Sequence, residues 1–168
     1  MFIKPREIIE ILKKNFFIKK TDKVTEFGCG GGYFTALLAD NVGEVFAVDI
    51  LEDHINETKE LIDIYGYKNV NFLNADVKNL QLEDNFFDVV FISQILFQNE
   101  GYDKILDSAL RILKDGGLVI ILEPNEKLPF MAGSPISYEF IQTYFKIKNK
   151  KIIFQKFFGK YYLIVAEK

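Results

Sequence analysis

The chain has very few of the residues that build metal sites and covalent cross-links. Its 168 residues include one cysteine, Cys29, and one histidine, His54. A single cysteine excludes an internal disulfide, and one cysteine with one histidine cannot complete a Cys/His zinc site within one chain. We therefore expect no metal in the functional site.

An excess of charge and long apolar stretches are also missing. The formal net charge is -3, which gives no electrostatic footprint for nucleic acid or an anionic membrane. No apolar run approaches the ~20 residues that cross a bilayer, and the first residues soon become amphipathic, unlike a signal peptide. We expect a cytoplasmic protein that binds neither a membrane nor nucleic acid.

Linkers, repeats and low-complexity tracts are absent as well, so nothing divides the chain into parts. Hydrophobic residues make up 49% of the sequence, which is ample for a packed core. The sequence therefore predicts a single domain over residues 1–168, with a leading helical segment in residues 1–20.

What is present is a regular alternation of short apolar runs with segments of helical periodicity. The expected strands are 24–27, 45–48, 70–73, 87–92 and 118–122, and the expected helices are 5–14, 33–40, 51–65 and 102–113. Strands that alternate with helices in this way favour a parallel sheet with right-handed crossovers and helices on both faces. The fold class is therefore α/β, a three-layer arrangement with a mostly parallel sheet.

The tail of the chain has a different pattern. Residues 151–157 and 161–166 are two apolar runs joined tightly at Gly159, which predicts an antiparallel hairpin and brings the sheet to seven strands. Several lysines gather near this hairpin, and they either face an acidic partner or protect the edge of the sheet. These lysines are at positions 146, 148, 150, 151 and 156.

A glycine-rich turn follows the first expected strand and opens directly into a helix. Residues 26–33 read Glu-Phe-Gly-Cys-Gly-Gly-Gly-Tyr. Glycine lets the backbone approach a ligand closely, and a helix start presents free N–H groups, so this order suits a nucleotide-type cofactor. The dinucleotide fingerprint G-x-G-x-x-G would need glycine at position 33, where Tyr33 stands, and this disfavours an NAD-dependent oxidoreductase.

The spacing of Glu26, Gly28, Gly30 and Gly32 resembles motif I of the class I (Rossmann-like) S-adenosylmethionine-dependent methyltransferases. Further landmarks of that family follow in order. Asp49 ends the second strand, Asp76 follows the third, and residues 87–94 and 113–118 resemble the fourth-strand motif and the turn before the fifth strand. The resemblance covers residues 20 to 125 and indicates a small member without a large cap domain.

The resemblance implies S-adenosylmethionine as cofactor, with S-adenosylhomocysteine as product. Glu26 would lie near the methionine amino group, Asp49 would hold the ribose hydroxyls, Asp76 and Val77 would fix the adenine edge, and Ile50 would pack on the adenine face. The expected cofactor contacts also include Gly28, Cys29, Gly30, Gly32, Tyr33, Ser93 and Gln94. The alternatives are a helix cap or turn for each aspartate and a small packing residue for Cys29. His54 is expected to be a solvated helix residue and not a catalytic one.

No general base can be named from the sequence, because a sulfonium is an activated methyl donor and alignment is the main task. The candidates near the reacting groups are Glu123, Gln94 and Tyr102. For Glu123 the alternative is a turn before Pro124 without any chemistry.

The acceptor is also open. The Asp/Asn-Pro-Pro-aromatic turn of amino-directed nucleic-acid methylases is replaced by Ser-Gln-Ile-Leu at residues 93–96, so a nucleic-acid acceptor is not expected. Residues 124–137 have the composition of a mobile lid, or else form an ordinary surface loop. A small molecule enclosed by a second subunit of a homodimer and a protein acceptor both fit an open acceptor face. The rival function is a non-catalytic cofactor-binding scaffold or activator subunit of a methyltransferase complex.

Overall fold

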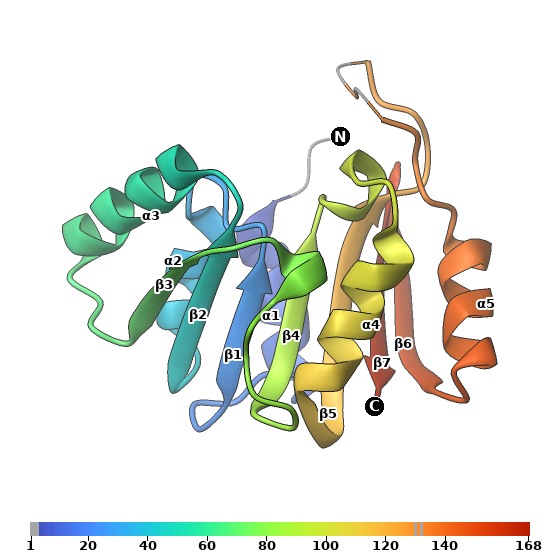
Figure 1. The fold of residues 1–168 in the computed structure, drawn as a ribbon, viewed down its shortest axis with the longest axis horizontal. Helices are drawn as coiled ribbons and strands as arrows, with labels where there is room; N and C mark the ends of the chain where they lie inside the picture. The colour runs from blue at the N-terminus through green and yellow to red at the C-terminus, as the bar shows by residue number, and fades with distance from the viewer. Residues whose placement is uncertain (1–3, 130, 132) are drawn as a thin grey trace.

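A computed structural model describes residues 4–129, 131 and 133–168, and its strands form one seven-stranded sheet of order β3-β2-β1-β4-β5-β7-β6 (Figure 1). The strands are β1 Lys23–Phe27, β2 Glu44–Asp49, β3 Val70–Asn74, β4 Phe87–Ser93, β5 Leu113–Pro124, β6 Lys151–Phe158 and β7 Tyr161–Glu167.

The first five strands are parallel, and β7 is antiparallel to both β5 and β6. This confirms the expected mostly parallel sheet with an antiparallel hairpin. One boundary differs from the sequence analysis, because β5 begins at Leu113 and not at residue 118. Leu113 pairs with Phe87 before the register shifts, so the glycines at 116 and 117 lie within the irregular start of the strand.

Helices cover both faces of the sheet (Figure 1). Apolar side chains of α1 and α2 pack on one face against Val24, Val45 and Phe91, whereas α4 and α5 pack on the other face against Phe27 and Ile121. The helices are α1 Pro5–Lys14, α2 Tyr33–Ala39, α3 Glu52–Tyr65, α4 Tyr102–Ile112 and α5 Tyr138–Ile147, with short 3-10 helices η1 Val77–Asn79 and η2 Leu96–Gln98. Within the described residues, no helix is long and apolar enough to cross a membrane.

Helix α5 was not expected from the sequence, although its signals are present. The side chain of Ser137 accepts a hydrogen bond from the Phe140 amide, which caps the first turn. Tyr138, Ile141 and Phe145 then bury one side of the helix. The helix lies between a proline-rich loop and the hairpin, outside the region where strands and helices alternate, and its periodicity was not recognised there.

The segment expected as a lid extends beyond the carboxyl edge of the sheet (Figure 1). Its ends are fixed, since Asn125 N donates to Lys160 O at 2.8 Å and Tyr138 N donates to Asn125 Oδ1 at 3.2 Å. The returning part of the loop packs so closely that a β-carbon at Gly133 would overlap the carbonyl of Phe97. Phe130, at the centre of the expected lid, lies outside the described residues.

Candidate functional site

A cleft of about 310 Å³ opens at the carboxyl ends of β1, β2, β3 and β4. It collects residues that are far apart in the sequence and that were expected to hold a cofactor. These are Gly28, Gly30, Asp49, Ile50, Asp76 and Val77, together with Ser93 and Gln94 at the end of β4. The parallel strands bring them together because their carboxyl ends share one edge of the sheet.

The carboxylate of Asp49 lies in the wall of this cleft, with 7% of the residue exposed. One oxygen accepts a hydrogen bond from Gly30 N and the other from Leu51 N, both at 3.0 Å. Each oxygen retains acceptor capacity, because a carboxylate oxygen has two lone pairs. Asp49 therefore fixes the loop around it and still has acceptor positions left in the wall of the cleft. A structural role and the expected contact with the ribose are compatible.

The three motif glycines are needed for different reasons, although all have positive φ. A β-carbon at Gly28 would overlap Cγ2 of Ile95, and a β-carbon at Gly32 would lie 3.1 Å from the Cα of Thr58 on α3. At Gly30 a β-carbon would meet no atom within 4 Å. Packing of the protein itself thus requires two of the glycines, whereas Gly30 faces open space in the cleft.

Helix α3 holds the glycine loop through Thr58. The Thr58 hydroxyl donates to Gly30 O at 2.8 Å and lies 3.4 Å from Cys29 Sγ. Burial raises the pKa of the Cys29 thiol to about 12. The Cys29 side chain packs with Ala47 and Ile55 and does not line the cleft, as expected of a small packing residue, so its expected cofactor contact stays a prediction for its backbone.

Glu26 is buried below the glycine loop and does not line the cleft either. Thr35 Oγ1 donates to its carboxylate at 2.5 Å. Burial raises the pKa of Glu26 to about 8, against the lowering effect of the Thr35 hydrogen bond. This hydrogen bond joins β1 to α2, the two elements that flank the glycine loop.

Two further residues of the loop region do not line the cleft, and their expected cofactor contacts stay predictions. Gly32 packs against Thr58, and the side chain of Tyr33 lines a separate hollow between α1, α2 and α3. Tyr33 is 72% exposed there. The sequence identified the loop but not which of its side chains face the cleft. A loop with four glycines lacks the regular alternation of side-chain directions that a strand has, so these directions could not be predicted.

The turn after β4 begins with Gln94, one of the expected cofactor contacts, and supplies one wall of the cleft. Gln94 has a left-handed φ of 59°, Gln98 Nε2 donates to Gln94 O, and Asn99 Nδ2 donates to Ile95 O, both at 2.7 Å. Ile95, Gln98 and Asn99 all line the cleft. We call residues 94–99 the 94–99 turn.

Glu123 anchors this turn and does not reach the cleft. Its Oε1 accepts hydrogen bonds from Ile95 N at 2.8 Å and Leu96 N at 2.9 Å. The residue is fully buried, and burial raises its pKa to about 8 despite these backbone donors. Its burial and these hydrogen bonds favour the structural alternative for Glu123 over a base or cation binder at the acceptor.

His54 is a cleft residue that the sequence analysis assigned to solvent. It lines the cleft, and its Nδ1 lies 3.2 Å from Asp49 Oδ2, in a geometry outside that of a hydrogen bond. Its position in the first turn of α3, directly after the strand that ends in Asp49, was the available signal.

Asp76 lines the cleft and also caps η1, since its Oδ1 accepts a hydrogen bond from Lys78 N at 2.9 Å.

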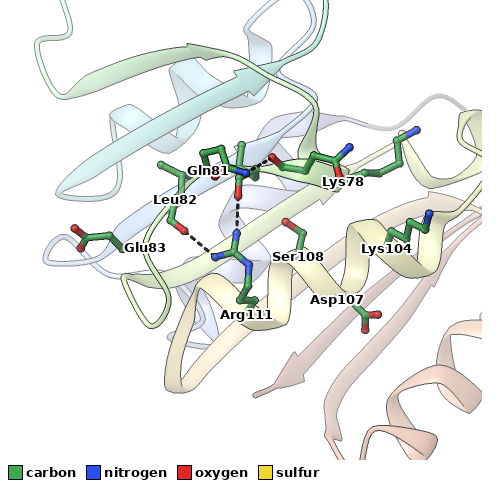
Figure 2. Close-up of a pocket in the computed structure, with 10 residues that line it drawn as sticks. Lys78, Gln81, Leu82, Glu83, Lys104, Asp107, Ser108 and Arg111 are labelled. Carbon is green, nitrogen blue, oxygen red and sulfur yellow. Dashed lines mark hydrogen bonds between the residues drawn. The ribbon is translucent and has the colours of Figure 1, made fainter.

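A larger hollow of about 630 Å³ lies away from this cleft, between α4 and the segment that leads from η1 to β4 (Figure 2). Arg111 crosses it and donates to Leu82 O at 2.8 Å and Leu80 O at 2.6 Å. These bonds fix a surface segment. The hollow contains neither the glycine loop nor Asp49, so we do not assign the cofactor to it.

Comparison with known proteins gives the family. A family described as "Methyltransferase domain" matches residues 18–155. The chain is 38% identical over 105 residues to phosphoethanolamine N-methyltransferase 1 of Triticum aestivum, covering 60% of this chain and 21% of that protein. It is 32% identical over 148 residues to a demethylmenaquinone methyltransferase of Bacillus cereus (strain ATCC 10987 / NRS 248), covering 86% of this chain and 60% of that protein.

Solved structures agree on the fold. A SAM-dependent methyltransferase from Aquifex aeolicus superposes with a TM-score of 0.81 at 22% identity, covering 99% of this chain and 98% of that one. The [4+2]-cyclase SpnF superposes with a TM-score of 0.83 at 16% identity, covering 96% and 80%. At these identities the likeness concerns the fold alone. Because the family match covers most of its length, the chain belongs to the methyltransferase domain family, and this membership implies S-adenosylmethionine as its cofactor.

Proposed function

We propose that this protein transfers a methyl group from S-adenosylmethionine to an acceptor, with the cofactor in the cleft beside Asp49. The observation that carries the proposal is the open face of Gly30 next to the Asp49 carboxylate. A bare backbone lets a ligand approach, and a carboxylate at the end of the second strand can accept hydrogen bonds from a ribose diol. The residues of the cleft therefore fit the cofactor.

The other cleft residues would hold the rest of the cofactor. Asp76 and the backbone of Val77 are suited to the adenine edge, and the side chains of Ile50 and Ile95 are suited to its faces. Ser93 and Gln94 lie at the end of β4 and would border the methionine portion.

When bound, the cofactor supplies a methyl group whose bond to sulfur breaks as an acceptor electron pair bonds to the carbon, leaving a neutral thioether. The chain's part is to align the acceptor with that carbon and to exclude water. A proton on the acceptor would pass to solvent or to a nearby group. Gln94 and Tyr102 stay candidates for contact with the acceptor.

The relatives named above act on different acceptors by name, phosphoethanolamine in one and demethylmenaquinone in the other. The chain spans 60% or less of the length of both, so neither acceptor transfers directly. A single domain, a cytoplasmic location, closure of the 124–137 loop and a homodimer or partner subunit stay predictions. The non-catalytic scaffold stays the rival function.

Thermal unfolding tests the cofactor first. Addition of S-adenosylhomocysteine should raise the melting temperature, because a ligand that binds only the folded state stabilises it, whereas NAD should have a much smaller effect. No response to S-adenosylhomocysteine would contradict the proposal.

Radiolabelled methyl transfer into a cell extract, fractionated by size, then separates the rival functions. Label in a small-molecule or protein fraction supports the enzyme. Cofactor binding without any transfer supports the scaffold.

A further inference from the structure

His54 lines the cofactor cleft beside Asp49, and the proposed function gives it no role. Strand β2 ends at Asp49 and helix α3 begins at Glu52, so His54 stands in the first turn of the helix, next to the end of the strand. Its Nδ1 lies 3.2 Å from Asp49 Oδ2. The imidazole and the carboxylate therefore belong to one wall of the cleft.

The two nitrogens of the His54 ring have different surroundings. Nδ1 is buried and makes no hydrogen bond within the described residues, and the Asp49 carboxylate is its neighbour. A carboxylate oxygen only accepts hydrogen bonds, so the nitrogen that faces it carries the proton, and Nε2 of the neutral ring is then an acceptor. Within the described part of the chain no hydrogen bond reaches Nε2, and 39% of the side chain is exposed. Nε2 is therefore available to a ligand.

The Asp49 carboxylate has limited acceptor capacity left for a ribose. Oδ2 accepts a hydrogen bond from Gly30 N, and Oδ1 accepts one from Leu51 N. Each oxygen has two lone pairs, so one acceptor position remains on each, and Oδ2 also has His54 Nδ1 beside it. Only Oδ1 has no second donor nearby. It suits one hydroxyl of a ribose diol, and the second hydroxyl needs another partner.

The amide side chains of the cleft are less suited to that second contact. Those of Gln98 and Asn99 donate to carbonyls of the 94–99 turn, both at 2.7 Å. In the sheet, β1 separates the polar residues at the end of β4 from the end of β2. His54 is thus the residue that combines a place beside Asp49 with a free acceptor nitrogen.

We propose that His54 is a second ribose-binding residue, whose Nε2 accepts a hydrogen bond from one ribose hydroxyl while the other hydroxyl donates to Asp49. This inference rests on the proposed function, because it concerns the same cleft. The pair makes the cleft selective for ribose over deoxyribose, since a ligand that lacks either hydroxyl leaves one polar group of the protein without its partner.

Calorimetric titration with three matched ligands tests this inference. The ligands are S-adenosylhomocysteine and its analogues that lack either the 2′-hydroxyl or the 3′-hydroxyl of the ribose. We expect each analogue to bind the original protein at least about fivefold more weakly than S-adenosylhomocysteine, because one hydrogen bond is lost.

The variant His54→Ala identifies the hydroxyl that His54 contacts. We expect it to weaken S-adenosylhomocysteine and one of the analogues about five- to tenfold. It should change the affinity for the other analogue less than about twofold, because that ligand lacks the hydroxyl that would meet Nε2. Asp53→Ala removes an exposed side chain from the same turn of α3, outside the described lining of the cleft, and should change all three affinities less than about twofold.

The outcomes separate the two proposals. If S-adenosylhomocysteine does not bind the original protein, the proposed function and this inference fail together. If it binds but His54→Ala leaves its affinity unchanged, only the inference about His54 is overturned. The same holds if His54→Ala weakens all three ligands by one common factor, which is the result that a merely structural role of His54 would give.

Discussion

Asp49 is the residue on which cofactor binding depends most directly. We expect Asp49→Ala to weaken S-adenosylhomocysteine binding by ~1 to 3 kcal/mol, because it removes charge-assisted hydrogen bonds to the ribose. Calorimetry measures the change, and Asp53→Ala, which removes an exposed carboxylate in the first turn of α3, is the control. Unchanged affinity in Asp49→Ala would show that the ribose lies elsewhere.

The glycines of the loop should separate binding from stability. Gly30→Ala fills open space in the cleft, so we expect it to abolish most cofactor binding. Its positive φ should also lower the free energy of unfolding by ~1 to 3 kcal/mol. Gly32→Ala has the same backbone penalty and also crowds Thr58, so its unfolding free energy should fall further. Urea unfolding with ligand titration compares the two, and equal losses of stability would contradict this assignment.

The buried acids Glu26 and Glu123 should make stability depend on pH. Both have a pKa of about 8 in the folded protein, raised by burial from an ordinary 4.5, so between these values the folded state keeps protons that the unfolded state has lost. The free energy of unfolding should therefore fall as pH rises from 4.5 to about 8, by up to ~1.4 kcal/mol per pH unit for each group.

The variant Glu123→Gln tests this sign. The amide oxygen can still accept from Ile95 and Leu96 but cannot ionise, so urea unfolding should give a shallower decline over the same pH range. Parallel curves for the variant and the original protein would contradict a raised pKa at Glu123.

Single residues differ in how far the sequence could place them. Asp49 and Asp76 were predictable because an acid at the end of a parallel strand lies at the ligand-binding edge. Tyr33 and Cys29 were not, because the direction of a loop side chain depends on neighbours such as Thr58. The partners of Glu123 could not be predicted, because the amides of the 94–99 turn are about 28 residues away along the chain.

At the scale of elements, α3 supports the site by holding the glycine loop. We expect Thr58→Val to reduce the free energy of unfolding by ~1 to 2 kcal/mol, because the carbonyl of Gly30 loses its donor, and to weaken cofactor binding. Thr143→Val is a matched control, since its hydroxyl donates to the Glu139 carbonyl on an exposed part of α5. If both variants behave alike, α3 does not support the site through this bond.

The helices and strands could be predicted from the spacing of apolar residues wherever strands alternate with helices. The hairpin was also predictable, because two apolar runs meet at Gly159. Helix α5 and the early start of β5 were not, since a capping serine after a proline-rich loop and a pairing of Leu113 with Phe87 depend on tertiary context.

For the whole molecule, the order of the strands fixes where a ligand can bind. The chain moves outward from β1 through β2 to β3 and then returns to β4 on the other side of β1. Ligands in open α/β sheets bind at such a reversal, outside the carboxyl ends of the strands. The cleft beside Asp49 lies at this position, whereas the hollow of Figure 2 lies beside α4 and away from Asp49.

A crystal structure with bound S-adenosylhomocysteine tests this account most directly. We expect the ribose hydroxyls within hydrogen-bond distance of the Asp49 carboxylate and the adenine between Ile50 and the 94–99 turn. Density for the ligand in the hollow around Arg111, or in any place that leaves Asp49 and Gly30 without contact, would contradict it.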